Sequence, residues 1–122
     1  HGDLGVVQAN DVLFLISNSG KTREILELID LSRNLYPDIK IIALSGQEKS
    51  PLGDLAHNNL HTGHPEEICP LGLTPTTSTT VMTVVGDILV VLLMEKIGFT
   101  KEEYSKRHHS GYLGYRARRV EP

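Results

Sequence analysis

The sequence predicts an α/β fold with a parallel sheet, and two observations lead to that prediction. Continuous apolar runs of strand length, "DVLFLI" at 11–16 and "IKIIALSG" at 39–46, indicate strands that are buried on both faces. Between them, apolar side chains recur at spacings of three and four, which is typical of a helix with one buried face. Strand, helix and strand in this order favour a parallel sheet with right-handed crossovers.

The first helix is expected to begin at Thr22 and to end at Tyr36, because a residue before proline is disfavoured in a helix. After the second strand, "SPLGDLA" predicts a short helix with Ser50 as its N-cap and Pro51 at its first position. The segment "NNLHTG", residues 58–63, is a weaker candidate for a third strand. The apolar positions of the first helix are Ile25, Leu28, Ile29, Leu31, Ser32 and Leu35.

The second half of the chain begins with a long loop. Prolines and glycines interrupt residues 64–77. A long helix is then expected to begin at 76–77 and to continue to Ile97, before a glycine. "TKEEYSKRH" at 100–108 predicts another helix with a capping box, and the tail 109–122 is predicted to be irregular and basic.

Composition limits the classes of function. The chain has 122 residues, 39% hydrophobic and 22% charged, which is typical of one soluble domain. A formal net charge of −3 gives no basic footprint, so we expect no nucleic-acid partner. The apolar stretch 81–94 is shorter than a membrane span and contains Asp87, so we expect no membrane partner. The lone Cys69 favours a reducing, cytoplasmic setting.

The predicted long helix is apolar on more than one face. A lone domain of this size would leave much of that surface in water. We therefore expect the helix to be buried against other copies of the chain in a homo-oligomer.

The segment Ser-Asn-Ser-Gly-Lys-Thr, residues 17–22, lies where the first strand ends and the first helix begins. Ligands of parallel sheets bind beyond the carboxyl ends of the strands, and a helix N-terminus favours an anion. Ser17, Ser19 and Thr22 add hydroxyl donors, and Gly20 lets a ligand approach the backbone closely. For any one hydroxyl, helix capping is the stronger explanation. The whole set favours binding of a phosphate monoester.

Two further clusters are less specific. The hydroxyl-rich segment 74–80 either caps the long helix or lies near an anion. His57, His61 and His64 with Glu66 match no recognised zinc spacing, and His64 precedes a proline, which fits a loop conformation. We therefore expect no metal and no other cofactor.

Several segments resemble, in order and spacing, the sugar isomerase (SIS) domain of the arabinose 5-phosphate isomerase family, which is KpsF/GutQ-like. They are "HGDLG", "ISNSGKTREI", "EEICPLGLTPTTSTT", "GD" at 86–87, "GFTKEEYSKRH" and "GYLG". Together they cover essentially the whole chain as one SIS domain. The resemblance implies a three-layer, flavodoxin-like α/β sandwich of SIS type that assembles as a metal-independent tetramer with shared active sites. It also implies interconversion of D-ribulose 5-phosphate and D-arabinose 5-phosphate, on the route to the acidic sugar Kdo of lipopolysaccharide and some capsules.

The resemblance also implies roles for single residues. Family glutamates fall on Glu24, in "SNSGxxxE", and on Glu67, before "CPLGL", and a family histidine falls on His108. Isomerisation moves a proton between adjacent carbons through an enediol, so these three are the expected acid and base groups, with Glu67 as the base toward carbon. The residues expected to bind the substrate are Ser17, Asn18, Ser19, Gly20, Thr22, His1, Thr76, Thr77 and His109.

Departures from the family pattern leave alternatives open. Lys21 stands where the family often has glutamate, and it either helps to bind an anion or faces solvent. His109 and Ser110 follow His108 in place of proline and glycine, so His109 could take the histidine's role. The chain begins at His1 rather than Met, and we expect it to lack the family's upstream strand–helix segment, with its "GxGKS" lysine, and the paired CBS modules that often follow.

These departures motivate an alternative function. In it, the chain is a non-catalytic SIS module that senses a phosphosugar or a nucleotide sugar and regulates a partner. Isomerisation of another phosphosugar, such as 6-phospho-3-hexulose, is a third possibility, since the loop at 17–22 interacts mainly with phosphate.

Overall fold

The computed structural model describes residues 2–119. These residues divide into two compact units, the first ending at Thr83 and the second beginning at Val84. The first unit contains the sheet, and the second contains short helices. The prediction that the chain is one SIS domain stays a prediction.

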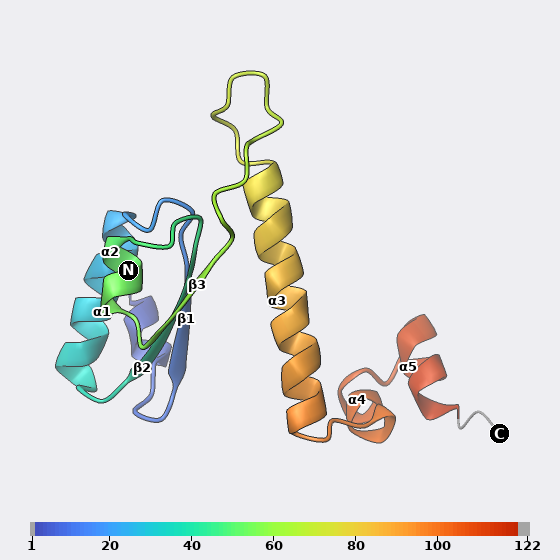
Figure 1. The fold of residues 1–122 in the computed structure, drawn as a ribbon. Helices are drawn as coiled ribbons and strands as arrows, with labels where there is room; N and C mark the ends of the chain where they lie inside the picture. Colours follow the sequence, from blue (N-terminus) through green and yellow to red (C-terminus); the bar gives the residue numbers. More distant parts are fainter. Residues whose placement is uncertain (1, 120–122) are drawn as a thin grey trace. The chain divides into compact units, whose positions relative to one another are not determined.

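The sheet of the first unit has three parallel strands in the order β1-β2-β3 (Figure 1). They are β1 (Val12–Ile16), β2 (Lys40–Ser45) and β3 (Asn58–His61). The central strand β2 pairs with β1 and with β3 in parallel. The three strands lie within the three segments predicted from the sequence, and the α/β fold with a parallel sheet is confirmed.

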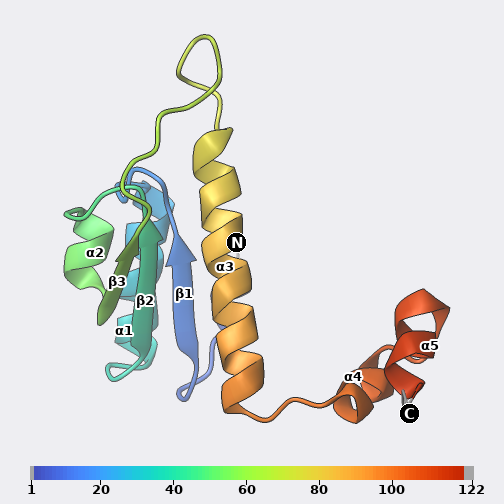
Figure 2. The ribbon, with the colours of Figure 1, turned by 45° about the vertical axis from the view of Figure 1, so that its right-hand side comes forward.

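Two helices cover one face of this sheet: α1 (Arg23–Leu35) and α2 (Pro51–Leu55) (Figure 2). The helix predicted from Thr22 is confirmed, and so are Ser50 as the N-cap of α2 and the proline at its start. Apolar side chains from the strands and from both helices meet between the two layers. The buried members of this core are Leu15, Ile29, Ile41, Ala43 and Leu52.

The opposite face of β1 carries apolar side chains that remain partly exposed. Val12, Phe14 and Ile16 are 54%, 38% and 48% exposed, whereas Leu44 on the central strand is buried. Alternating inward and outward positions of a strand explain why Leu15 is buried between these exposed neighbours. This face is the one that the third layer of the predicted sandwich would cover.

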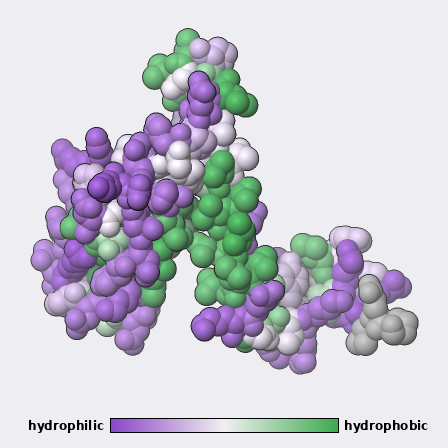
Figure 3. All heavy atoms as spheres, in the orientation of Figure 1, coloured by the Kyte–Doolittle hydropathy of each residue, from purple (hydrophilic) through white to green (hydrophobic). Residues whose placement is uncertain are grey.

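A long helix, α3 (Thr77–Lys96), begins in the first unit and ends in the second. It ends before Gly98, whose φ of 61° is left-handed, as the sequence predicted. Figure 3 shows hydrophobic side chains along this helix. Those that are about half exposed include Val84, Ile88, Val90, Val91, Leu92 and Leu93.

By length and apolar composition alone, α3 could cross a membrane. The expectation that no segment is long enough was therefore wrong. It counted only the apolar stretch 81–94, whereas the helix also includes the threonines before that stretch and reaches Lys96. One such helix is weak evidence, because a helix buried between protein subunits meets the same criteria. The absence of a membrane partner stays a prediction.

The second unit contains α4 (Lys101–Arg107) and α5 (Gly111–Arg118). Thr100 caps α4, its Oγ1 accepting a hydrogen bond from the Glu103 backbone N–H at 3.2 Å. The prediction of an irregular tail was wrong over 111–118, which forms α5. Gly111 has a left-handed φ of 71°, which allows the chain to turn into the helix. Gly114 is buried against the backbone of His108, where the absence of a side chain allows close packing. In the sequence these glycines had indicated a loop. The short 3-10 helix η1 (Asp3–Val6) was not predicted either.

Candidate active site

The loops that follow β1 and β2 are tied together at the carboxyl edge of the sheet. The Ser17 N–H donates to the Leu44 carbonyl at 3.0 Å, and the Gly46 N–H donates to the Asn18 carbonyl at 2.9 Å. A Cβ at position 46, directly after β2, would lie 2.9 Å from the Asn18 carbonyl oxygen, so the loops approach this closely only with glycine there. Residues 17–22, here called the anion loop after their predicted role, therefore lie at the edge where parallel sheets bind ligands.

The hydroxyls of this loop bond to the loop itself. Ser17 is buried; its Oγ lies 2.7 Å from Thr22 Oγ1 and accepts from the Gly20 N–H at 3.2 Å. Ser19 Oγ accepts from the N–H of Lys21, which is itself exposed. Thr22 precedes α1 but makes no side-chain hydrogen bond to its first turn. The hydroxyl of Thr22 therefore does not cap α1, and the anion-binding role of this loop stays a prediction.

Gly20 is held against the start of α2. Its φ of 62° is left-handed, and its carbonyl accepts from the Leu52 N–H at 3.0 Å. A Cβ at position 20 would overlap the side chain of Ser50. Ser50 Oγ in turn accepts from the Gly53 N–H at 3.1 Å as the N-cap of α2. The N-terminus of α2 therefore packs against the anion loop at Gly20, and only glycine fits at this position.

Glu67 caps α3. Its Oε2 accepts hydrogen bonds from the Thr76 N–H and hydroxyl, both at 2.7 Å, and from the Ser78 N–H at 3.3 Å. Hydrogen-bond donors on Ser78 and Thr76 lower the pKa of Glu67 from 4.5 to about 2. The predicted substrate ligand Thr76 is thus engaged with Glu67, and Thr77 is the half-buried first residue of α3. The substrate-binding and catalytic roles of these residues stay predictions.

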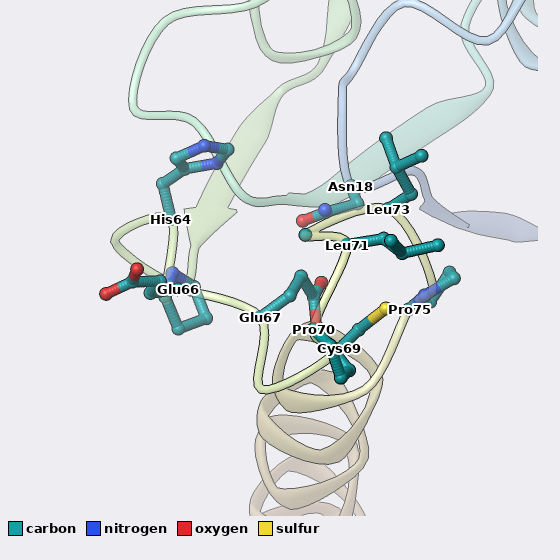
Figure 4. A pocket seen from close by; sticks show the side chains of 11 residues that line it. Asn18, His64, Glu66, Glu67, Cys69, Pro70, Leu71, Leu73 and Pro75 are labelled. Carbon is teal, nitrogen blue, oxygen red and sulfur yellow. The ribbon is translucent and has the colours of Figure 1, made fainter.

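A cavity of about 610 Å³ lies beside Glu67 and Asn18 (Figure 4). Small-molecule sites typically have volumes of roughly 300–1,000 Å³, so the cavity has a suitable size for a sugar phosphate. Asn18 comes from the anion loop, and the other lining residues come from the loop 64–75. The full lining consists of Asn18, His64, Pro65, Glu66, Glu67, Cys69, Pro70, Leu71, Gly72, Leu73 and Pro75. The cavity is thus lined both by Asn18, which is predicted to bind the substrate, and by Glu67, the predicted base.

Two lining residues had no assigned role in the sequence. Cys69 is half-buried, and hydrogen bonds from the Thr74 hydroxyl and from the backbone of Thr74, Leu73 and Leu71 lower its pKa from 9.0 to about 6. In the sequence, only its position directly after Glu67 and Ile68 indicated that Cys69 could lie near the site. His64 carries a left-handed φ of 55°, and its Nδ1 lies 2.9 Å from Gln47 Nε2, a contact that sequence spacing could not reveal.

The remaining predicted residues are not brought to this cavity by the described contacts. Glu24 is exposed in the first turn of α1. His108 ends α4 in the second unit, where its ring stacks on Tyr104 with a centroid distance of 4.8 Å, and His109 follows it. His1 lies outside the described residues. The roles of these residues at the site stay predictions.

The histidines considered as metal ligands occupy separate places. His57 Nδ1 accepts from the Ile41 N–H at 3.1 Å, so it serves the backbone of β2. Among residues 2–119, no group of three His, Cys, Asp or Glu side chains is arranged to hold a metal ion.

Comparison with known proteins identifies the family. Residues 1–92 match the model of the SIS domain. The chain belongs to the SIS domain family. Among its curated relatives, arabinose 5-phosphate isomerase KdsD of Pseudomonas aeruginosa is 44% identical over 116 residues, which are 95% of this chain and 35% of that protein. KdsD of Escherichia coli K12 is 42% identical over 114 residues, 93% of this chain and 34% of the relative. The chain thus spans about a third of the length of these proteins.

Solved SIS structures resemble the chain closely. A Bacteroides fragilis protein, described as a phosphosugar isomerase involved in capsule formation, has a TM-score of 0.88 and 63% identity, over 92% of this chain and 58% of that one. An E. coli CFT073 protein crystallised in complex with arabinose 5-phosphate has a TM-score of 0.81 and 35% identity, over 88% of this chain and 56% of that one. The predicted family and the α/β SIS fold are confirmed.

Proposed function

We propose that the protein containing this chain is a cytoplasmic aldose–ketose isomerase of sugar phosphates. Its proposed reaction interconverts D-ribulose 5-phosphate and D-arabinose 5-phosphate, on the route to the acidic sugar Kdo of lipopolysaccharide or capsule. The observation that carries this proposal is the cavity that joins Asn18 of the anion loop to Glu67, in a chain 44% identical to KdsD over 95% of its length.

In this proposal the anion loop holds the phosphate. The backbone N–H groups at the start of α1 and the hydroxyls of Ser19 and Thr22 supply the donors, while Ser17 and Gly20 hold the loop in shape. Anchoring the phosphate there places the sugar carbons against the cavity side chains, which is how positioning lowers the barrier. Lys21 adds a positive charge beside the same loop.

The acid and base groups then act on the anchored sugar. A carboxylate, Glu67 or Glu24, removes a proton from carbon to form the enediol, and a second group moves the proton between the oxygens. The imidazole of His108 or His109 would carry out that second step or ring opening, because an imidazole can both donate and accept a proton. No cofactor is required for this chemistry.

The experiment is an isomerase assay on the full-length protein with D-ribulose 5-phosphate and no added metal. We expect turnover, and a loss of about 10²-fold or more in kcat for Glu67→Gln if it supplies the base. Glu48→Gln, which changes an exposed carboxylate outside the cavity, is the matched control and should keep full activity. Absence of turnover in the unmodified protein would contradict the proposed function.

One observation supports the alternative that the chain is a non-catalytic regulatory module. The carboxylate of Glu67 is occupied by α3, as expected of a structural residue in a sensor module. A sensor would show ligand-dependent stabilisation by arabinose 5-phosphate, or by a nucleotide sugar, without any isomerisation.

We also propose that the apolar surface of α3 is covered by other copies of the chain in a tetramer. Val84, Ile88, Val91 and Leu92 are each 52–55% exposed and surround an apolar hollow on this helix. Light scattering should find a tetramer, and Ile88→Asp should dissociate it, whereas the conservative Ile88→Val should not. A monomer in the unmodified full-length protein would contradict this assembly.

A further inference from the structure

His64 is the one residue other than glycine with a positive φ among residues 2–119. Its φ of 55° is left-handed, a conformation in which histidine is found more often than most side chains but which still requires support from its surroundings. Here the preceding Gly63 also has a positive φ, 75°, so the chain turns sharply after β3. This turn brings the imidazole to the cavity instead of letting β3 continue past it.

The imidazole is fixed by a residue from the neighbouring strand. Gln47, just after β2, places its side-chain Nε2 at 2.9 Å from His64 Nδ1. The amide nitrogen of Gln47 is a donor, so His64 Nδ1 accepts this hydrogen bond and the ring N–H is on Nε2. The backbone N–H of Gln47 donates to Ser45 Oγ at 3.3 Å, and Ser45 Oγ donates back to the Gln47 carbonyl at 2.8 Å. Gln47 is therefore itself held in place, and the Nε2–H of His64 is left as a donor of defined position.

The cavity that His64 lines adjoins the anion loop. His64 and Asn18 line the same cavity, and both lie against the Gly46 position, where an added Cβ would be 3.3 Å from His64 Nδ1 and 2.5 Å from Asn18 Oδ1. Figure 4 shows His64, Asn18 and Glu67 around this cavity, Asn18 from the anion loop and the other two from the loop 64–75. With phosphate held by the anion loop, the cavity is where the hydroxyls of the sugar would lie.

We propose that His64 is a specificity-determining residue, whose Nε2–H donates a hydrogen bond to a hydroxyl of the sugar phosphate bound in this cavity. Gln47 is the positioning residue that holds its tautomer. This inference rests on the proposed function, because it takes the ligand to be a sugar phosphate. It adds a group that recognises the sugar and not its phosphate.

The test measures binding of non-reacting polyol 5-phosphates and of inorganic phosphate to the full-length protein and its variants, together with kcat and KM. His64→Gly removes the imidazole while permitting φ of 55°, and His64→Asn keeps a short donor in a residue that tolerates this backbone. We expect His64→Gly to weaken polyol phosphate binding and to raise KM by about 3- to 10-fold, the effect of one neutral hydrogen bond, with kcat nearly unchanged. His64→Asn should recover part of this loss. Affinity for inorganic phosphate should not change.

The tautomer is tested by Gln47→Met, which keeps the side-chain length but cannot donate. It should reproduce part of the KM effect and add little to His64→Gly in the double variant. A set of polyol phosphates that each lack one hydroxyl identifies the hydroxyl that His64 contacts. The compound that lacks this hydroxyl should bind the unmodified protein and His64→Gly with equal affinity.

Equal affinity of the unmodified protein and His64→Gly for every polyol phosphate would overturn the inference, and so would equal weakening of inorganic phosphate. Failure of the proposed function is seen separately, as binding without turnover in the unmodified protein. Thermal melting of each variant shows that it is folded.

Discussion

The contact between Gly20 and Ser50 predicts a large and specific effect of one added methyl group. In Gly20→Ala, the new Cβ would overlap Ser50 at a position whose φ is already 62°. A left-handed alanine costs about 1–2 kcal/mol, and overpacking a filled site costs about 1–3 kcal/mol more. The free energy of unfolding should therefore fall by about 3 kcal/mol, or Tm by about 6–12 °C in a protein larger than this chain.

The two contributions can be separated by removing the other side of the contact. Ser50→Gly should cost only a few tenths of a kcal/mol, since glycine is a tolerated N-cap. In the double variant the nearest obstacles to the new Cβ are gone, and the next atom is Leu52 Cβ at 3.7 Å. The double variant should then lose only the left-handed backbone cost, about 1–2 kcal/mol, so it should be more stable than Gly20→Ala alone.

The assay is thermal and chemical denaturation of the full-length protein, with phosphate binding measured on the same samples. Gly5→Ala is the matched control, because Gly5 is exposed, a Cβ there meets no atom within 4 Å and its φ is not left-handed, so stability should hold. Strictly additive effects of Gly20→Ala and Ser50→Gly would refute the steric explanation. Unchanged phosphate affinity in Gly20→Ala would refute the claim that α2 supports the anion loop.

Three further predictions concern titration and packing. Glu67→Gln should lower Tm near neutral pH, and the difference from the unmodified protein should shrink as pH falls from 4.5 toward 2. The reason is that a carboxylate whose pKa is lowered on folding stabilises the protein only above its unfolded pKa, and loses that effect on protonation. Iodoacetamide should alkylate Cys69 at a rate that rises around pH 6 and not around pH 9, with Thr74→Val moving the midpoint upward, as followed by mass spectrometry. Gly114→Ala should lower Tm and disturb His108, because its Cβ would overlap the His108 carbonyl, and an unchanged His108 imidazole resonance in NMR would contradict this.

Much of the fold follows from local patterns. The apolar runs 11–16 and 39–46 have strand length and do form strands, although one face of β1 is partly exposed where burial on both faces was expected, and the spacing of Ile25 and Ile29 defines the buried face of α1. Ser50 before a proline fixes the start of α2 by capping chemistry alone. The place of the loop 17–22 was predictable for the same reason, since a strand, a glycine and a helix start lie in direct succession.

What could not be predicted depends on contacts between distant segments. Glu67 precedes Thr76 by nine positions, and only the fold of the intervening loop brings the carboxylate onto the first residues of α3. The pairing of His64 with Gln47 joins the ends of two strands, for which no sequence spacing exists. α5 was not predicted because Ser110, Gly111 and Gly114 indicate a loop more strongly than the weak apolar pattern of 111–118 indicates a helix. Gly114 instead allows close packing against His108, a contact that the sequence does not show.

The environment of Glu67 bears on which carboxylate takes the proton from carbon. Three hydrogen bonds and a pKa of about 2 make Glu67 a weak base, whereas an efficient general base has a pKa near the working pH. If Glu67 acts as the base, substrate must displace the donors of Thr76 and Ser78, and the pKa of Glu67 must rise in the complex.

The pH profiles of the full-length enzyme show whether Glu67 or Glu24 is the base. An acid limb in kcat near pH 5–6 that is lost in Glu67→Gln, with no such limb in kcat/KM, would mean that substrate releases Glu67 from α3. An acid limb in both profiles that survives Glu67→Gln and is lost in Glu24→Gln would assign the base to Glu24, and leave Glu67 to hold α3 at the edge of the cavity.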